Sequence, residues 1–153
     1  MTEGKMSITD MNFKERSLLF AKLASIAYCN EKDAKSQVKK LGFTTVEFYN
    51  KDGAQAYRFM NKDDIVIACR GTQPSEFNDI KADLKAMPVM AETVSRVHRG
   101  FKAEVDELWP MVCDDLVRTQ NRDKKVWFCG HSLGAAMATI MASRCMFYAS
   151  VPD

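Results

Sequence analysis

A glycine-flanked serine stands between an apolar run typical of a strand and an apolar run typical of a helix. Val126–Cys129 is short and rich in β-branched and aromatic residues, whereas the residues from Leu133 onward are mostly good helix formers. The G-x-S-x-G pattern centred on Ser132 therefore predicts a tight strand-to-helix turn. Side chains two positions either side of the serine would collide, and Gly130 and Gly134 remove them.

Such a turn would expose the serine hydroxyl beside the unpaired N–H groups at the start of the new helix. An ordinary Gly-Ser turn before a helix, without any chemistry, is the alternative interpretation. The apolar runs on both sides favour the catalytic interpretation, because the motif requires a strand before it and a helix after it.

Length and composition indicate one globular domain with enough apolar residues for a core. The chain has 153 residues, of which 46% are hydrophobic and 27% charged, and its net charge is +2. So small a charge, without a long basic block, argues against nucleic acid as a partner. No apolar run reaches the roughly 18 residues of a membrane-spanning helix. We expect no signal peptide, because Met1–Asp10 is polar.

The cysteines are five, an odd number, and two of them, Cys69 and Cys129, lie inside apolar strand-like runs. This pattern predicts buried free thiols and hence a reducing, cytoplasmic location. Neither C-x-x-C nor H-x-x-x-H spacing occurs, so we expect no metal site and no cofactor.

The first half of the chain predicts two helices and then three strands. Asp10 is expected to cap a helix over Met11–Cys29, and Asn30 a helix over Glu31–Leu41 that ends at Gly42. The three strands should form an antiparallel meander whose first hairpin turns at Asn50–Gly53. The expected strands are Phe43–Tyr49, Ala54–Met60 and Ile65–Cys69.

A long helix that opens at Val97–Phe101 should connect this meander to the strand before Ser132, with a kink at Pro110. A weaker helix is expected over Asn78–Ala86, and Met87–Ser95 shows no clear period. The apolar stripe of the long helix consists of Phe101, Val105, Leu108, Val112 and Leu116.

The predicted fold class is α/β. Because Ile65–Cys69 and Val126–Cys129 are apolar throughout and a helix connects them, we expect them to lie side by side as parallel strands. The sheet would then be mixed, with the antiparallel meander on one side of the parallel pair and helices on its faces.

Several motifs resemble those of the class 3, or fungal-type, lipases, which have the α/β-hydrolase fold. Ile67–Thr72 resembles that family's strand ending in F-R-G-T, Val97–Phe101 matches V-H-x-G-F, and Gly130–Ala136 is similar to G-H-S-L-G-G-A. Asn78–Leu84 also resembles the family's D-W-x-x-D-L. The motifs occur in the family's order, and the resemblance covers most of residues 15–150. Departures from the patterns are Cys69 for an aromatic residue, Ile80 for tryptophan and Ala135 for glycine.

The resemblance implies roles for individual residues. Ser132 would be the nucleophile that accepts the acyl group, and the backbone N–H groups of Thr72 and Leu133 would stabilise the oxyanion. The loop 73–90 corresponds to the lid of these lipases, and Met87–Met90 would present an apolar surface to lipid. Packing of that segment into the core is the alternative.

The sequence does not supply a complete catalytic triad after Ser132. In α/β-hydrolases an acid and then a histidine follow the serine, but here only Asp153 and no histidine follow it. We expect His131 to turn away from the serine and to hydrogen-bond beside the elbow. His98 is expected to be structural, with a role as substitute base as the alternative. Residues 1–153 are therefore predicted to be the N-terminal portion of one domain, truncated before the triad's Asp and His.

Two functions follow from these observations. The first is a lipase or carboxylesterase that cleaves acyl esters through an acyl-enzyme on Ser132, completed by residues outside this chain. The second is a non-catalytic remnant of the same fold that serves binding or assembly. An acyl ester or lipid is the expected substrate, and triacylglycerol, phospholipid and small esters all fit. Transient contact with a lipid surface and self-association are the other expected interactions.

Overall fold

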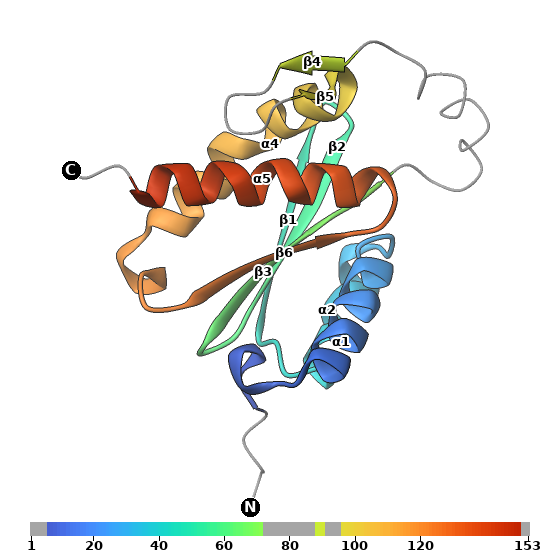
Figure 1. Ribbon diagram of the computed structural model, residues 1–153. Helices are drawn as coiled ribbons and strands as arrows, with labels where there is room; N and C mark the ends of the chain where they lie inside the picture. Colours follow the sequence, from blue (N-terminus) through green and yellow to red (C-terminus); the bar gives the residue numbers. More distant parts are fainter. Residues whose placement is uncertain (1–5, 72–87, 91–95, 151–153) are drawn as a thin grey trace, which may run out of the picture.

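One mixed sheet of four strands forms the centre of the protein, as the sequence predicts (Figure 1). A computed structural model describes residues 6–71, 88–90 and 96–150. The strands are β1 (Thr45–Lys51), β2 (Ala54–Met60), β3 (Asp64–Cys69) and β6 (Lys125–Gly130). Their order is β1-β2-β3-β6, with β1, β2 and β3 antiparallel and β6 parallel to β3. The expected parallel pair is thus confirmed.

The first hairpin turns one residue later than expected. Its central residues are Asp52 and Gly53, with φ of 50° and 87°, and Lys51 pairs with Ala54. A two-residue turn with positive φ at both positions matches the twist of the strands, and the Asp-Gly pair suits it. Strand β1 therefore continues to Lys51 rather than ending at Tyr49.

Part of the stretch without a clear period forms a second, two-stranded antiparallel ribbon. Its strands are β4 (Pro88–Met90) and β5 (Arg96–His98), and Pro88 pairs with His98. The long helix α4 (Arg99–Val117) begins directly after β5. The helix expected over Asn78–Ala86 and most of the expected lid loop lie outside the described residues.

The first helix does not begin at the predicted cap. Asp10 lies in a short 3-10 helix, η1 (Ile8–Asp10), and α1 (Phe13–Ile26) is capped by Asn12 instead. The Asn12 side chain accepts the Glu15 N–H at 2.9 Å, and the Glu15 carboxylate accepts the Asn12 N–H at 2.9 Å. This reciprocal pair satisfies two N–H groups at the start of the helix, which a single acceptor at Asp10 would not do.

The second helix begins and ends as predicted. Asn30 caps α2 (Glu31–Lys40) by accepting the Asp33 N–H at 2.9 Å. Gly42, with φ of 94°, lies just past its end in the left-handed region that favours glycine.

Helices cover both faces of the sheet, with α1 and α2 on one side and α4 and α5 (Leu133–Ser150) on the other (Figure 1). All six residues of β3 are buried, and its side chains alternate between the two faces. Ile65, Ile67 and Cys69 belong to the core under α4 and α5, whereas Val66 and Ala68 belong to the core under α1 and α2. Cover on both faces explains why Ile65–Cys69 is apolar without interruption. Asp64, the buried first residue of β3, accepts hydrogen bonds from the Ile8 N–H and the Trp127 indole.

The α4 stripe packs as the sequence predicts. On α4, Val105, Leu108 and Val112 are fully buried, and Phe101 and Leu116 are partly buried against the same core. Pro110 lies inside α4, on its exposed side.

Strand β6 is less buried than its apolar sequence suggests. Only Cys129 is buried, while Val126, Trp127 and Phe128 are half-buried. Within the described part of the chain, β6 is the last strand of the sheet and pairs on one side only, with β3. An apolar sequence does not distinguish a central strand from a strand at the edge.

A buried acidic residue fastens α4 to the meander. The Asp115 carboxylate accepts a hydrogen bond from the Tyr49 hydroxyl and forms an ion pair with Arg58 at 2.8 Å. A second ion pair, with Arg118, has a distance of 3.2 Å. Burial and the neighbouring Asp115 carboxylate raise the pKa of Tyr49, so its hydroxyl stays protonated. Removing one partner of such a buried cluster leaves an uncompensated charge, which lowers the free energy of unfolding by about 3–5 kcal/mol.

None of the five cysteines is in a disulfide, as expected. Cys69 and Cys129 lie on neighbouring strands but in the cores on opposite faces of the sheet. Their sulfurs therefore cannot meet. Within the described ranges, no helix combines the length and apolarity that crossing a membrane would require.

Candidate active site

Two loops leave the sheet at the same edge, at the carboxyl ends of the parallel strands. Cys69, the last residue of β3, is in register with Gly130, the last residue of β6. The segments Arg70–Gly71 and His131–Ser132 follow these strands directly, and helix α5 begins at Leu133. The carboxyl edge of parallel strands is where α/β proteins commonly place their sites.

Ser132 has the strained backbone that the sequence predicts for a strand-to-helix turn. Its φ is 56°, and Asp52 is the only other residue besides glycine with positive φ in the described part of the chain. The turn is closed by two hydrogen bonds, from the Gly134 N–H to the His131 carbonyl and from the Ala135 N–H to the Ser132 carbonyl, each at 3.0 Å. The left-handed conformation costs a residue other than glycine of order 1–3 kcal/mol, and it persists only where the surrounding structure imposes it.

Glycines are required on both sides of this turn. A Cβ atom at Gly130 would lie 2.3 Å from the carbonyl of Gly134, and one at Gly134 would lie 2.3 Å from the Cys69 carbonyl oxygen. These obstructing atoms belong to the backbone, so no side-chain movement relieves them. The pair of glycines therefore allows the first turn of α5 to approach the ends of β6 and β3 closely.

Of the two predicted oxyanion donors, Leu133 and Thr72, only Leu133 lies within the described residues. Leu133 is the first residue of α5, and no acceptor for its N–H is found within the described ranges. Thr72 lies outside the described residues. Its neighbour Gly71 is buried against the elbow, because a Cβ atom there would lie 2.8 Å from the His131 oxygen and 3.0 Å from the Gly134 nitrogen.

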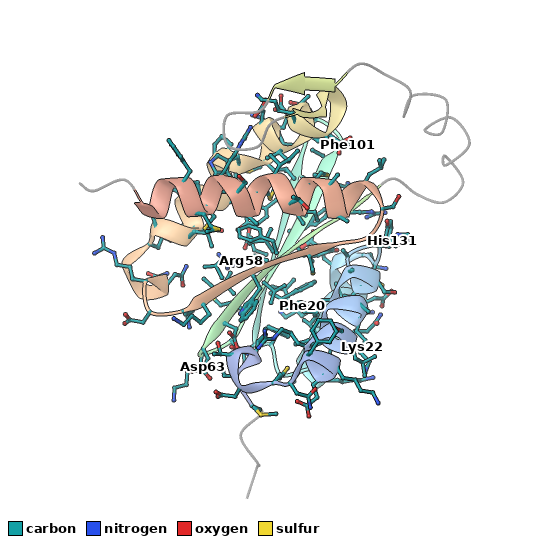
Figure 2. All side chains as sticks on the ribbon, viewed as in Figure 1. Phe20, Lys22, Arg58, Asp63, Phe101 and His131 are labelled. Atoms are coloured by element: carbon teal, nitrogen blue, oxygen red, sulfur yellow. The ribbon has the colours of Figure 1, made fainter. Side chains whose placement is uncertain are left out.

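His131 is exposed, at the end of the sheet near α1 (Figure 2). Its ring contacts a tyrosine rather than Ser132. The Tyr28 hydroxyl lies 3.2 Å from Nδ1 of His131 and donates to the His131 carbonyl at 3.4 Å. Their rings also meet edge to face, with centroids 6.0 Å apart. This agrees with the expected role of His131 in hydrogen bonding beside the elbow.

His98, the alternative base, is the last residue of β5, immediately before α4. Its side chain lies outside the described part of the structure. The structure therefore leaves the role of His98 as a hypothesis.

Tyr28 is a residue of this site that sequence reasoning missed. It follows the last turn of α1 and reaches the exit of β3, where its oxygen would lie 2.8 Å from a Cβ atom on Gly71. Burial raises the pKa of Tyr28, while the charge of Arg70 and a hydrogen bond from the Gly71 backbone lower it by less. The hydroxyl thus remains a donor at neutral pH. No pattern in the sequence marks a tyrosine just past a helix as a partner of a residue 103 positions away.

The buried thiols beside the elbow are not competing nucleophiles. Burial raises the pKa of the Cys129 thiol to about 12 and raises that of Cys69 as well. A thiol attacks only as the thiolate, which is scarce at neutral pH under these conditions. Ser132, by contrast, is only half-buried in the turn that follows Cys129 and Gly130.

A hollow of about 380 Å³ adjoins the elbow on its His131 side. It is lined by Ala21, Ala24, Ser25, Tyr28 and His131. Among the described residues, no group of histidines, cysteines and acidic residues is arranged to hold a metal ion.

Comparisons with known proteins agree with this geometry. Residues 66–150, more than half of the chain, match the family described as lipase (class 3). A search of curated proteins found no match. The lipase of Rhizopus microsporus var. chinensis superimposes with a TM-score of 0.67 and 22% identity, over 90% of this chain and 53% of that one.

Two further lipase structures are similar. The triacylglyceride lipase of Rhizomucor miehei gives a TM-score of 0.62 with 22% identity, over 92% of this chain and 58% of its own. A triacylglycerol lipase whose catalytic centre is formed by a serine protease triad gives 0.66 with 24% identity, over 86% and 55%. At these identities the likeness establishes the fold, an α/β-hydrolase, as expected. The chain spans about half the length of the lipases it matches.

Proposed function

Since this chain belongs to the class 3 lipase family, we propose that it carries the nucleophile of a serine ester hydrolase that acts on lipid esters. Ser132 is the nucleophile in this proposal. The observation that carries it is the φ of 56° at Ser132, in a turn whose two flanking glycines leave no room for a Cβ atom. A fold that needed only a turn before a helix would not require this strain.

In the proposed reaction, the Ser132 oxygen attacks the carbonyl carbon of the ester, and its proton passes to a base. The carbonyl oxygen becomes an oxyanion, which the N–H of Leu133 and the N–H of Thr72 stabilise. The carbon–oxygen bond to the alcohol then breaks, and the alcohol leaves with the proton from the base. Water hydrolyses the resulting acyl-serine by the same steps and releases the carboxylic acid.

The position of Leu133 supports its role in this scheme. The first N–H groups of a helix have no partner within the helix, and they lie at the positive end of its dipole. The contacts of Gly71 with the elbow support a place for Thr72 nearby, because Thr72 is the next residue in the chain. Each oxyanion donor of this type lowers the activation free energy by about 3–4 kcal/mol.

We place the base and its carboxylate outside the 153 residues. Of the two histidines in the chain, His131 is engaged with Tyr28, and His98 stands in the ribbon before α4. The lipases that the chain resembles extend beyond the part that it matches, which supports this placement. A triacylglycerol is the proposed substrate, because the similar structures include triacylglycerol lipases.

Active-site labelling tests the proposal directly. A fluorophosphonate reacts with an activated serine, forms a phosphorus–oxygen bond and expels fluoride. We expect slow labelling of the peptide that contains Ser132, detected by mass spectrometry, and none in Ser132→Ala. Ser36→Ala, at an exposed serine of α2, is the matched control and should label as the original chain does.

The coding sequence beyond codon 153 provides the second arm. If it encodes an acid and then a histidine, the extended protein should label much faster than this chain does. Should neither protein label at Ser132, the second function holds, and the fold serves binding or assembly without catalysis.

A further inference from the structure

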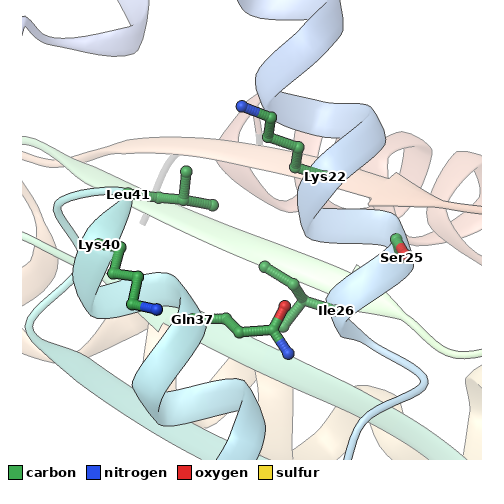
Figure 3. Close-up of a pocket in the computed structure, with 6 residues that line it drawn as sticks. All are labelled: Lys22, Ser25, Ile26, Gln37, Lys40 and Leu41. Carbon is green, nitrogen blue, oxygen red and sulfur yellow. The ribbon is translucent and has the colours of Figure 1, made fainter.

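Two adjoining hollows lie on the side of α1 that faces α2, away from the sheet. The first, of about 330 Å³, lies between the two helices (Figure 3). The second, of about 340 Å³, continues toward the start of α1. Both are lined by Lys22 and Leu41, so they meet at these two residues. We call them the head hollow and the tail hollow, because their linings differ in chemistry.

Four of the six residues that line the head hollow are polar. Lys22 and Ser25 come from α1, and Gln37 and Lys40 come from α2 (Figure 3). The Lys22 ammonium and the Ser25 hydroxyl are donors suited to a carboxylate or another small anion, and the Gln37 amide, which donates to the Cys29 sulfur at 3.5 Å, has a second N–H. Among the described residues, Lys22 has no acidic partner.

The tail hollow is lined mainly by flexible apolar side chains. Leu18 is 56% exposed and Met6 is 48% exposed, so both offer apolar surface to a ligand. Its one acidic residue, Glu15, already accepts the Asn12 N–H in the helix cap. Methionine adapts its shape to different apolar ligands. The apolar lining consists of Met6, Met11, Leu18, Leu19 and Leu41.

The surroundings of both hollows carry an excess of positive charge. Helices α1 and α2 with their connection, residues 13–40, contain seven lysines and arginines against three acidic residues, a net charge of +4. The whole chain carries only +2, so the remaining residues sum to −2. The region thus attracts anions while the rest of the chain does not.

We propose that the two hollows together bind one single-chain anionic amphiphile, such as a fatty-acid carboxylate. The anionic head lies at Lys22, and the acyl chain lies in the tail hollow against Leu18 and Met11. The volumes are those of ordinary small-molecule sites, which span about 300–1,000 Å³. Binding here does not require Ser132, so this site stands or falls independently of the proposed hydrolase activity.

Three ligands with the same twelve-carbon chain and different heads test the charge requirement. Laurate is anionic, dodecanol neutral and dodecyltrimethylammonium cationic. The two charged ligands are used below their micelle concentrations, and dodecanol below its solubility limit. Titration calorimetry should show binding of laurate to the chain at least about tenfold tighter than of the cation, which corresponds to about 1.4 kcal/mol. Amide chemical shifts in the ¹⁵N spectrum should move at Lys22, Gln37 and Leu41, and not at Ser132.

Variants locate the site, and all of them change exposed side chains that the fold does not need. Lys22→Glu should weaken laurate binding about fivefold or more, whereas Lys22→Arg should retain it. Leu18→Glu should weaken it as well, through loss of the tail contact. Lys35→Glu, an exposed lysine of α2 outside both hollows, is the matched control for overall charge and should bind laurate as the original chain does.

Three outcomes would overturn the proposal. Equal binding of laurate and the cationic ligand would show that no anion site exists. Equal weakening by Lys22→Glu and Lys35→Glu would indicate general electrostatic attraction. Binding to phosphatidylglycerol vesicles without binding of monomeric laurate would assign the surface to a bilayer rather than to a single amphiphile.

Discussion

The hydroxyl of Tyr28 lies 3.2 Å from Nδ1 of His131, which joins the end of α1 to the residue before Ser132. The same oxygen contacts Gly71 at the exit of β3. One side chain thus bridges the two loops that the proposed oxyanion site needs, although it belongs to neither. A movement of α1 relative to the sheet would therefore shift the contacts of Tyr28 with His131 and Gly71.

Removing this bridge should affect the site more than the fold. Tyr28→Phe should lower the free energy of unfolding by about 1 kcal/mol, the value of one hydrogen bond, and should slow fluorophosphonate labelling of Ser132. Tyr57→Phe is the control, because the Tyr57 hydroxyl donates to the Cys29 carbonyl at 2.7 Å, away from the elbow. It should cost similar stability in urea unfolding and leave labelling unchanged. Equal labelling rates in both variants would remove Tyr28 from the site.

The free energy of unfolding should fall more when Gly134 is replaced by alanine than when the turn glycine Gly53 is replaced. Gly134→Ala would bring a Cβ atom to 2.3 Å from the Cys69 oxygen, so we expect a loss of about 3 kcal/mol or failure to fold. Gly53→Ala has only the strain of its left-handed backbone and no neighbour within 4 Å, so about 1–2 kcal/mol is expected. Urea unfolding measures both. A smaller loss for Gly134→Ala than for Gly53→Ala would contradict the described packing.

Alkaline pH should destabilise the chain through its buried thiols. Because the pKa of Cys129 is raised to about 12 in the fold, the folded state holds this proton where the unfolded state, near pKa 9, releases it. The contribution to stability is full below pH 9 and is lost as the pH rises toward 12, by at most about 1.4 kcal/mol per pH unit. Urea unfolding at pH 8 and at pH 10.5 should show a smaller drop in Cys129→Ala than in the original chain. An equal drop in Cys129→Ala and in the original chain would contradict this prediction.

We propose that the chain associates with itself near the free edge of β6. Within the described residues β6 pairs only with β3, and unpaired strand edges attract other strands. Light scattering at micromolar concentration should report a dimer or larger species. Met146→Glu, at a side chain of α5 that is 76% exposed, should weaken association, while Leu18→Glu, on α1 and 56% exposed, should not. A monomer at all concentrations would end this proposal.

Ester hydrolysis by this chain alone should be barely above background. Without a base to take its proton, a serine is a weak nucleophile at neutral pH, and an oxyanion site with substrate binding leaves about 10³-fold over water. The measurement is p-nitrophenyl butyrate hydrolysis by the chain, Ser132→Ala and His98→Ala. Activity like that of a complete lipase would contradict the prediction, and its loss in His98→Ala would identify the base.

Local sequence patterns were sufficient to predict the elbow and the layout of the sheet. Gly130, Ser132 and Gly134 specify a turn that few other residues tolerate, and the apolar runs on both sides specify what the turn connects. The alternation along β3, the cap at Asn30 and the exit at Gly42 follow from the same local rules. These features depend on neighbours within a few positions, so the order of residues contains them.

Features that depend on distant partners emerged only from the packed fold. Strand β6 is half-buried because of its place in the sheet. The bridge from Tyr28 to His131 spans 103 positions, and the pairing of Tyr49 with Asp115 spans 66. Such contacts arise when elements pack face to face, where burial selects the partner of each polar group, and sequence periodicity carries no information about which residues will meet.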